Sequence, residues 1–446
     1  MAFLNAAARP EAGLQGSAAG GLPMFPWAIF WTALAVRLAA LTLGHFYRFS
    51  PLEDHFQFGW EMGRVARSLA TGHGYANPFD HPSGPTAWVT PLYPLILAAV
   101  FRVFGVYTAL SAWVILAFNT VVNALMVRTT WEIAARCFNR RVALWSAWIW
   151  ALYPAAMQFA VKWVWEISLT AFLFSCILVL ALRMRNIGGG ESESDPATAL
   201  RWAMFGLLWG LATLSSASIA IFLPFCGLWV TKGISGLRRQ MPRVLLAAAI
   251  CLACILPWTI RNALVFHHFI PMRTNFGAEL WAVNAPGTSG MVIGSPVALP
   301  REEALLDQMG EWAYCRWRGQ IALGRIRHNP KAYLKLSLLR FYFFWADVPH
   351  SYARGKAWTE FVRNLSFQFA SIVGLLGLTL AVRRRVPAAA LFAMAFTVIP
   401  FVYYFTFAQA RFRHPLEPLI VILGVYLFQS AEKSWDVRWF RRAVQY

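Results

Sequence analysis

Ala388 to Phe407, AAALFAMAFTVIPFVYYFTF, is a run of 20 residues without a charged side chain. A helix of this length rises about 30 Å, which matches the hydrocarbon core of a bilayer. Basic residues stand on both sides of the run: Arg383 to Arg385 precede it, and RFRH, Arg411 to His414, follows it shortly after. The stretch therefore predicts a membrane-spanning helix.

Similar apolar runs recur along the whole chain of 446 residues, which is 58% hydrophobic and only 13% charged. Soluble domains average about 25% charged residues. We expect an all-α polytopic membrane protein with about ten transmembrane helices, supplemented by juxtamembrane helices. The predicted spans are Trp27–Gly44, Thr108–Val127, Val142–Phe159, Ile167–Leu182, Trp202–Ser216, Ile219–Val230, Val244–Ile260, Leu365–Val382, Ala388–Phe407 and Leu416–Leu427.

The formal net charge of +20 comes largely from short basic clusters between these runs, such as Arg140 and Arg141. No cluster forms a continuous basic face with interleaved aromatics, so nucleic-acid binding is not indicated. The positive-inside rule places the clusters in the cytoplasm. All of them share that side if two short apolar runs, Pro91 to Gly105 and Tyr333 to Trp345, lie against the membrane interface without crossing.

This topology divides the chain into three parts. Residues 1–26 are predicted to form a cytoplasmic N-terminal tail, 27–432 the transmembrane domain, and 433–446 a basic cytoplasmic C-terminal tail. The two large extracytoplasmic loops are then 45–107 and 261–364. The six cysteines lie mostly within apolar runs, where we expect small buried residues and not metal or redox ligands.

The first loop opens with PLEDHFQFGWEMGRVARSL, Pro51 to Leu69, which holds three of the chain's 20 acids. On one continuous helix, polar residues would recur there at steps of three or four and share a face. They are Asp54, Gln57, Glu61, Arg64 and Ser68. A solvated juxtamembrane face explains them simply. The alternative is catalytic, because a carboxylate at the membrane edge has its basicity raised and suits proton abstraction.

Further charged residues are predicted on the same side of the membrane, near the ends of spans. They are Lys162 and Glu166 before the fourth span, Arg261 after the seventh, and Arg411, Arg413 and His414 before the last. Lys162 and Glu166 are four apart, so an ion pair on one helical face also explains them. Arginine offers bidentate donors to phosphate, and the set suits a phosphate-bearing lipid. The sequence contains no GxxxxGK[ST] phosphate loop, so a nucleotide-driven pump is not indicated.

Several motifs resemble bacterial membrane glycosyltransferases of the GT-C superfamily, akin to protein O-mannosyltransferases and to the aminoarabinose transferase that modifies lipid A. They are ARSLATGHGYANPF, SGPTAWVTPLYPLILAAVFRVFG, PWTIRNALVFHHFIPMRTNFGAELWAVN and RFRHPLEP. The resemblance extends from Arg37 to about Leu427. It implies a GT-C fold and an inverting transfer of a sugar from a polyprenyl-phosphate donor in the membrane to a glycan, lipid or protein acceptor. The expected location is the extracytoplasmic face of the bacterial cytoplasmic (inner) membrane.

The resemblance also implies roles for individual residues. Such enzymes carry an essential acid in the first extracytoplasmic loop, and Asp54 matches its place. The spacing from Asp54 to ARSL is about one helical turn longer than in the family, which leaves Glu61 as a competitor. The residues implied to bind substrate are Glu53, Lys162, Glu166, Arg261, Arg411, Arg413 and His414. No residue is assigned as a metal ligand. A divalent cation is an open alternative, because the resemblance implies that Glu166 holds the acceptor, a water or a cation.

Two alternatives remain. A secondary transporter would place ionisable residues near the middle of its spans, whereas most of the acids and arginines here fall at span ends, with Arg37 as the main exception. A ligase or oligosaccharyltransferase would use a polyprenyl-diphosphate donor and, in some cases, a divalent metal.

Overall fold

A computed structural model describes residues 22–49, 57–189, 196–234, 236–285, 288, 297, 299–347 and 357–443. Within these residues the regular structure is helical, and the only β-pairing is an isolated bridge between Ala76 and Pro85. The helices are α1 (Trp27–Leu43), α3 (Glu61–Ala70), α4 (Leu92–Phe104), α5 (Ala109–Cys137), α6 (Arg140–Leu152), α7 (Pro154–Val161), α8 (Ile167–Met184), α9 (Ala199–Ser215), η1 (Ala217–Phe222), α10 (Leu223–Lys232), α11 (Leu237–Phe266), α12 (Phe276–Val283), α13 (Pro300–Met309), α14 (Glu311–His328), α15 (Pro330–Ala346), α16 (Ala357–Arg383), α17 (Ala389–Phe405), η2 (Ala410–Leu416) and α18 (Glu417–Ala443).

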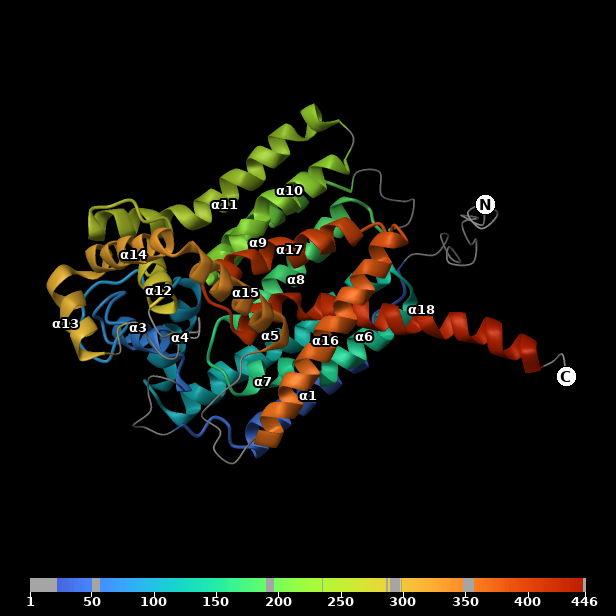
Figure 1. The fold of residues 1–446 in the computed structure, drawn as a ribbon, viewed down its shortest axis with the longest axis horizontal. Helices are drawn as coiled ribbons and strands as arrows, with labels where there is room; N and C mark the ends of the chain where they lie inside the picture. The colour runs from blue at the N-terminus through green and yellow to red at the C-terminus, as the bar shows by residue number, and fades with distance from the viewer. Residues whose placement is uncertain are drawn as a thin grey trace.

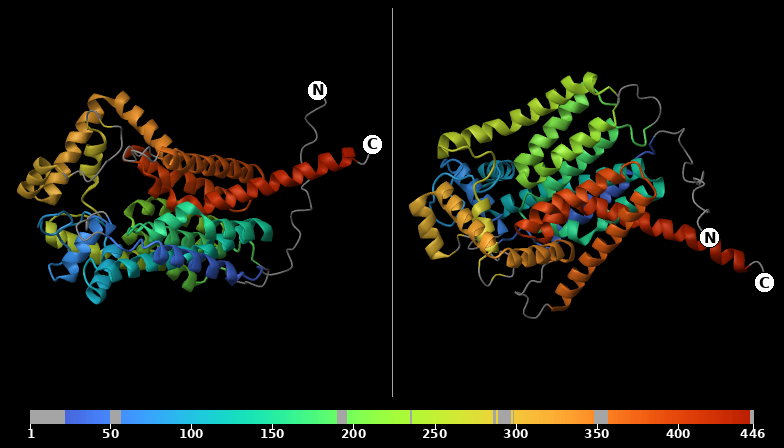
Figure 2. Two further views of the ribbon diagram at one scale, coloured as in Figure 1. Left: turned by 90° about the horizontal axis from the view of Figure 1, so that it is seen from below. Right: turned by 45° about the horizontal axis from the view of Figure 1, so that its top comes forward.

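The long helices form a bundle, and the helices of the two large loops gather at one end of it (Figure 1). There α3 and α4, from the first loop, lie beside α12, α13 and α14 from the second, and both further views agree (Figure 2). α1 begins and α18 finishes toward the opposite end. Parts of the chain that are about 200 residues apart in sequence therefore meet at one end of the bundle.

Membrane crossing is supported by the length and composition of individual helices. Among the described residues, four stretches are long and apolar enough to span a bilayer: Ala109–Cys137, Ile167–Met184, Gln240–Phe266 and Phe361–Arg383. Shorter apolar helices accompany them, at Trp27–Leu43, Leu92–Phe104, Ala199–Ser215, Ala217–Lys232 and Ala389–Phe405. The prediction of an all-α multi-pass membrane protein is confirmed, while the count of ten spans stays a prediction.

The predicted third span is interrupted. α6 finishes at Leu152 and α7 starts at Pro154, because proline has no N–H to give to the carbonyl four residues earlier. Arg37, fully buried in α1, takes over this role: its guanidinium donates to the carbonyls of Trp150 at 3.0 Å and Ala151 at 2.6 Å. The arginine that stood out inside an apolar run is thus a cap for a helix end.

Close backbone approach holds the apolar helices together. α9 and α11 pack side by side, and a Cβ on Gly206 would lie 2.1 Å from the carbonyl oxygen of Ala247. The hydrophobic effect does not drive helices together in lipid, so small residues at such crossings stabilise the pair by allowing close van der Waals packing. Cys251 and Cys254 lie on this same part of α11, where Cys251 is buried, as the sequence predicted, and Cys254 is half-buried.

Candidate active site

The acidic stretch of the first loop differs from the single helix that its spacing predicts. Glu53 and Asp54 lie outside the described residues. Glu61 is described, and it is the first residue of α3, because the backbone reverses just before it at Gly59 (φ +88°) and Trp60 (φ +52°). The face proposed to run from residue 54 to residue 68 is therefore wrong as one helix. Glu61 instead occupies a helix N-terminus, where the helix dipole favours a carboxylate.

Gly59 places Glu61 against another part of the chain. A Cβ at this position would lie 2.3 Å from the carbonyl oxygen of Val164, so only glycine permits the approach. Val164 belongs to the turn between α7 and α8, and this turn also carries Glu166 immediately before α8. The contact brings the backbone of Glu61 next to the segment that presents Glu166.

The same turn corrects a second expectation. Lys162 and Glu166 do not share a helical face, since α7 finishes at Val161 and α8 begins at Ile167. Lys162 is exposed, with its Nζ 4.5 Å from the centre of the Phe46 ring. The two residues therefore have different surroundings, and Glu166 alone points to the interior.

Three carboxylates from different segments each lie within electrostatic reach of the same two guanidinium groups. We call them the charge cluster: Glu61, Glu166, Glu279, Arg273 and Arg411. Burial raises the pKa of all three acids, and the two arginines oppose this effect at each of them. Burial likewise lowers the pKa of Arg411, and the three carboxylates act against that shift. The charges therefore face one region of low dielectric at the end of the bundle.

Within the charge cluster, Arg411 differs from Arg273 in that the described residues offer its donors no acceptor. Among the described residues, no acceptor lies within hydrogen-bonding or ion-pairing distance of its guanidinium, and its Nε is shielded from solvent without a partner. The guanidinium lies among aromatic rings instead, with its central carbon 4.0 Å from the Trp165 ring centre and 5.0 Å from that of Phe412. Such a group can receive an anion without first breaking an ion pair.

A pocket extends from this point between the ends of α8, η1, α17 and η2. Its cavity volume is about 20 Å³, room for one water molecule, and its polar lining comes from Glu166, Thr170, Ser216, Ser218, Tyr403 and Arg411. The hydroxyls of Ser218 and Tyr403 are hydrogen-bonded to each other. Arg411 and Glu166 thus present opposite charges to one cavity with hydroxyl groups along its wall.

The structure gives the neighbouring predicted residues other contacts. Arg413 is fully buried and donates to Glu417 Oε1 at 2.6 Å, and to the carbonyls of Trp345 at 3.2 Å and Phe367 at 3.1 Å. His414 is fully buried and stacks on Trp150. These contacts favour a structural role for both residues.

Arg261, in the last turns of α11, also has its donors engaged. Its guanidinium donates to the carbonyls of Thr86 at 2.6 Å and Tyr75 at 2.8 Å, and to Asn262 Oδ1 at 3.0 Å. It therefore fastens the first loop to the end of α11. Its electrostatic partners are Tyr75 and Glu311, and the members of the charge cluster are not among them.

Two members of the cluster were not among the predicted site residues. Arg273 donates from Nε to the carbonyl of Trp88 at 2.9 Å, and Glu279 accepts from Asn275 Nδ2 at 2.6 Å. The pair itself is loose, at 3.4 Å between Arg273 and Glu279. Both lie in the motif MRTNFGAELW, around the start of α12. The signal that could have identified them is this pair of opposite charges in a loop predicted to face the site.

Comparison with known proteins identifies the fold. No sequence profile of a protein family matches the chain, and no characterised protein matches it by sequence. The apo structure of the Archaeoglobus fulgidus oligosaccharyltransferase superposes with a TM-score of 0.50 at 15% identity, over 94% of this chain and 51% of that one. Oligosaccharyltransferase AglB from that organism, with an inhibitory peptide and a dolichol-phosphate, gives 0.48 at 15% identity over 94% and 52%. ArnT from Cupriavidus metallidurans, bound to undecaprenyl phosphate, gives 0.38 at 15% identity over 93% and 80%.

At a TM-score of 0.50, the chain shares the fold of the archaeal oligosaccharyltransferase, which confirms at the level of the fold the expectation drawn from the sequence motifs. This chain is a multi-pass membrane protein with a GT-C fold. It spans about half the length of the archaeal oligosaccharyltransferase, and at 15% identity the similarity concerns the fold alone.

Proposed function

We propose that the protein is an inverting glycosyltransferase that moves a sugar from a polyprenyl-phosphate donor to an acceptor at the extracytoplasmic membrane face of a bacterial cytoplasmic membrane. The observation that carries the proposal is the charge cluster, in which Arg411 keeps its donors unpaired beside three carboxylates. An anionic headgroup and an acceptor hydroxyl or amine need these two kinds of group side by side.

The chemical step is a single displacement at the anomeric carbon. The acceptor oxygen or nitrogen forms a bond to this carbon while the bond from the carbon to the phosphate oxygen breaks, and the configuration inverts. The acceptor's proton passes to a carboxylate, and polyprenyl phosphate leaves with the bonding electrons. Arg411 and Arg273 would stabilise the charge that develops on the leaving phosphate.

Asp54 and Glu61 remain the two candidates for the base. Burial raises the pKa of Glu61, which improves a carboxylate as a proton acceptor near neutral pH. Glu166 faces the pocket, where it would orient the acceptor. Glu279 would hold Arg273 toward the donor phosphate, since the two side chains are already 3.4 Å apart. Other predicted residues would hold the loops and helix ends in place without touching the substrates. They are Lys162, Arg261, Arg413 and His414.

The test uses purified protein in lipid nanodiscs, a panel of polyprenyl-phosphate sugars and a membrane extract as the source of acceptor. Asp54→Asn and Glu61→Gln are compared with wild type, and Glu193→Gln in the predicted cytoplasmic linker serves as the control. We expect at least one of the first two to lose transfer by about 10²-fold or more, while the control keeps it. Full transfer by both would overturn the assignment of the base.

The same assay separates the alternatives. Polyprenyl-diphosphate donors are supplied in parallel, and each reaction is repeated with a chelator. Transfer only from the diphosphate donor, or uptake of sugar into liposomes without a transfer product, would contradict the proposed reaction.

A further inference from the structure

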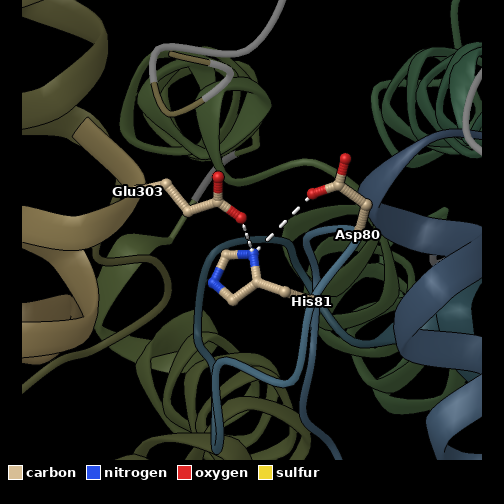
Figure 3. A group of neighbouring side chains, drawn as sticks. All are labelled: Asp80, His81 and Glu303. Atoms are coloured by element: carbon tan, nitrogen blue, oxygen red, sulfur yellow. Dashed lines mark ion pairs between the residues drawn. The ribbon is translucent and has the colours of Figure 1, made fainter. Parts of the chain in front are cut away.

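A second group of charged side chains joins the two large loops, and none of its members belongs to the charge cluster. His81, at the tip of a turn in the first loop, lies between Asp80 from that turn and Glu303 from α13 (Figure 3). Its Nδ1 contacts Glu303 Oε1 and lies 3.7 Å from Asp80 Oδ1. On the other side of the ring, Nε2 lies 3.0 Å from Asp307 Oδ1.

The turn that presents His81 is built to hold its shape. The bridge between Ala76 and Pro85 closes it, and Asn77 and Gly84 exchange two hydrogen bonds of 2.9 Å across it. Phe79 is buried and stacks on the His81 ring with 6.0 Å between centroids. The imidazole therefore has a fixed position opposite α13.

α13 presents two acids to this imidazole. Glu303 and Asp307 are four residues apart, so they lie on one helical face, and like charges with this spacing destabilise a helix. Asp80 adds a third negative charge at the same place. A cation bound between the three carboxylates and the imidazole would neutralise this concentration of negative charge.

The arrangement of the imidazole nitrogens indicates where this cation would lie. Nε2–H can donate to Asp307, which fixes the tautomer whose Nδ1 lone pair faces Asp80 and Glu303. Within the described part of the chain, this Nδ1 is shielded from solvent and makes no hydrogen bond of acceptable geometry. A carboxylate that orients a ligating histidine from behind is a recurrent feature of metal sites.

We propose that Asp80, His81 Nδ1 and Glu303 bind a divalent transition-metal ion of the Zn²⁺ type, with Asp307 as the residue that orients His81. Zinc holds nitrogen and carboxylate oxygen at about 2.0–2.2 Å in a tetrahedron, so its ligand atoms lie about 3.4 Å apart. The three ligand atoms here already lie within 4.8 Å of one another. Water would complete the tetrahedron, since Asp80 is largely exposed at 77% of its side-chain surface. The ion would clamp the first loop onto α13.

The test measures Zn²⁺ binding by calorimetry on the full chain, purified in nanodiscs after treatment with a chelator. We expect one site in wild type, and its loss in His81→Ala. His73→Ala is the matched control, because His73 is an exposed histidine of the same loop whose ring contacts Thr71 and no carboxylate. Asp307→Asn should bind about 10–100-fold more weakly. Thermal unfolding of each protein without metal shows whether it is folded.

Asp80→Asn keeps the proposal testable if His81→Ala unfolds, because an exposed side chain can be replaced without loss of the fold. This variant should bind Zn²⁺ at least tenfold more weakly, and zinc should raise its unfolding temperature less than that of wild type. The proposal is overturned if wild type binds no more Zn²⁺ than His81→Ala, or if Asp80→Asn binds as well as wild type. The group would then be a clamp made by side-chain contacts alone.

Discussion

Arg411 and Arg413 are two residues apart in one 3₁₀ turn, and the proposed function requires that they act differently. Replacing Arg411 by methionine retains the apolar stem and removes the charge. In the structure the guanidinium is held by the rings of Trp165 and Phe412, and such cation–π contacts are worth about 0.5–2 kcal/mol. We therefore expect a loss of stability of about 1 kcal/mol. The loss in transfer should be far larger, about 10²–10³-fold in kcat, as for removal of one donor to a developing oxyanion.

Arg413→Met is the matched control. This change removes one partner of a buried ion pair and leaves Glu417, which is 1% exposed, without its counter-charge. Breaking a buried pair in this way costs about 3–5 kcal/mol. Arg413→Met should therefore unfold at a clearly lower temperature, and the double variant with Glu417→Gln should recover part of the difference.

The assay combines thermal unfolding in nanodiscs with initial rates of transfer over a range of donor concentrations. Rates are divided by the fraction of folded protein at the assay temperature. The reasoning is refuted if folded Arg411→Met transfers sugar as fast as wild type. It is also refuted if Arg413→Met is as stable as wild type, because the buried pair would then not hold the turn that presents Arg411.

Three further outcomes follow from particular contacts. Gly59→Ala should lose about 1–3 kcal/mol of stability and most of its transfer activity, since the added Cβ would meet the Val164 carbonyl. Gly74 also has a positive φ but has open space around it, so Gly74→Ala should lose stability alone. Unfolding and rate measurements compare the two variants. Burial raises the pKa of Glu166, so the folded protein holds this proton to a higher pH than the unfolded chain does. Wild type should therefore lose stability as pH rises from about 4.5 through that raised pKa. Glu166→Gln should show a smaller loss in unfolding curves recorded against pH. Glu311→Gln should cost about 1–3 kcal/mol in the same assay, because its carboxylate accepts three hydrogen bonds that tie the first loop to the second.

The sequence predicts several of the apolar helices because the length of an apolar run is visible in it. α1, α8 and α17 begin and finish within a few residues of the predicted spans. The interruptions were missed, at Tyr153 and at Gly59 with Trp60, since each depends on a contact with a distant segment. The pattern of apolar residues within one run cannot show that a distant segment will stabilise an interruption of the helix.

The candidate site was predicted in part for the same reason. Glu61, Glu166 and Arg411 were singled out because charges at the ends of apolar runs are unusual, and the structure brings all three into the charge cluster. Arg273 and Glu279 lie just before and within the short helix α12 of the large second loop, away from the ends of the apolar runs that directed the prediction. Likewise, a sequence cannot show that the donors of an arginine such as Arg413 are already consumed by carbonyl groups.

The contact between Arg37 and the end of α6 carries a consequence for assembly in the membrane. The carbonyls of Trp150 and Ala151 accept from a helix more than 110 residues earlier in the chain. The Trp150 carbonyl also accepts from the Tyr153 N–H at 3.3 Å, but hydrocarbon offers no substitute for the Arg37 donors, and an unsatisfied carbonyl there costs several kcal/mol. The kink is therefore fully satisfied in lipid only once α1 has docked, so the stability of this part of the domain depends on the order in which its helices assemble.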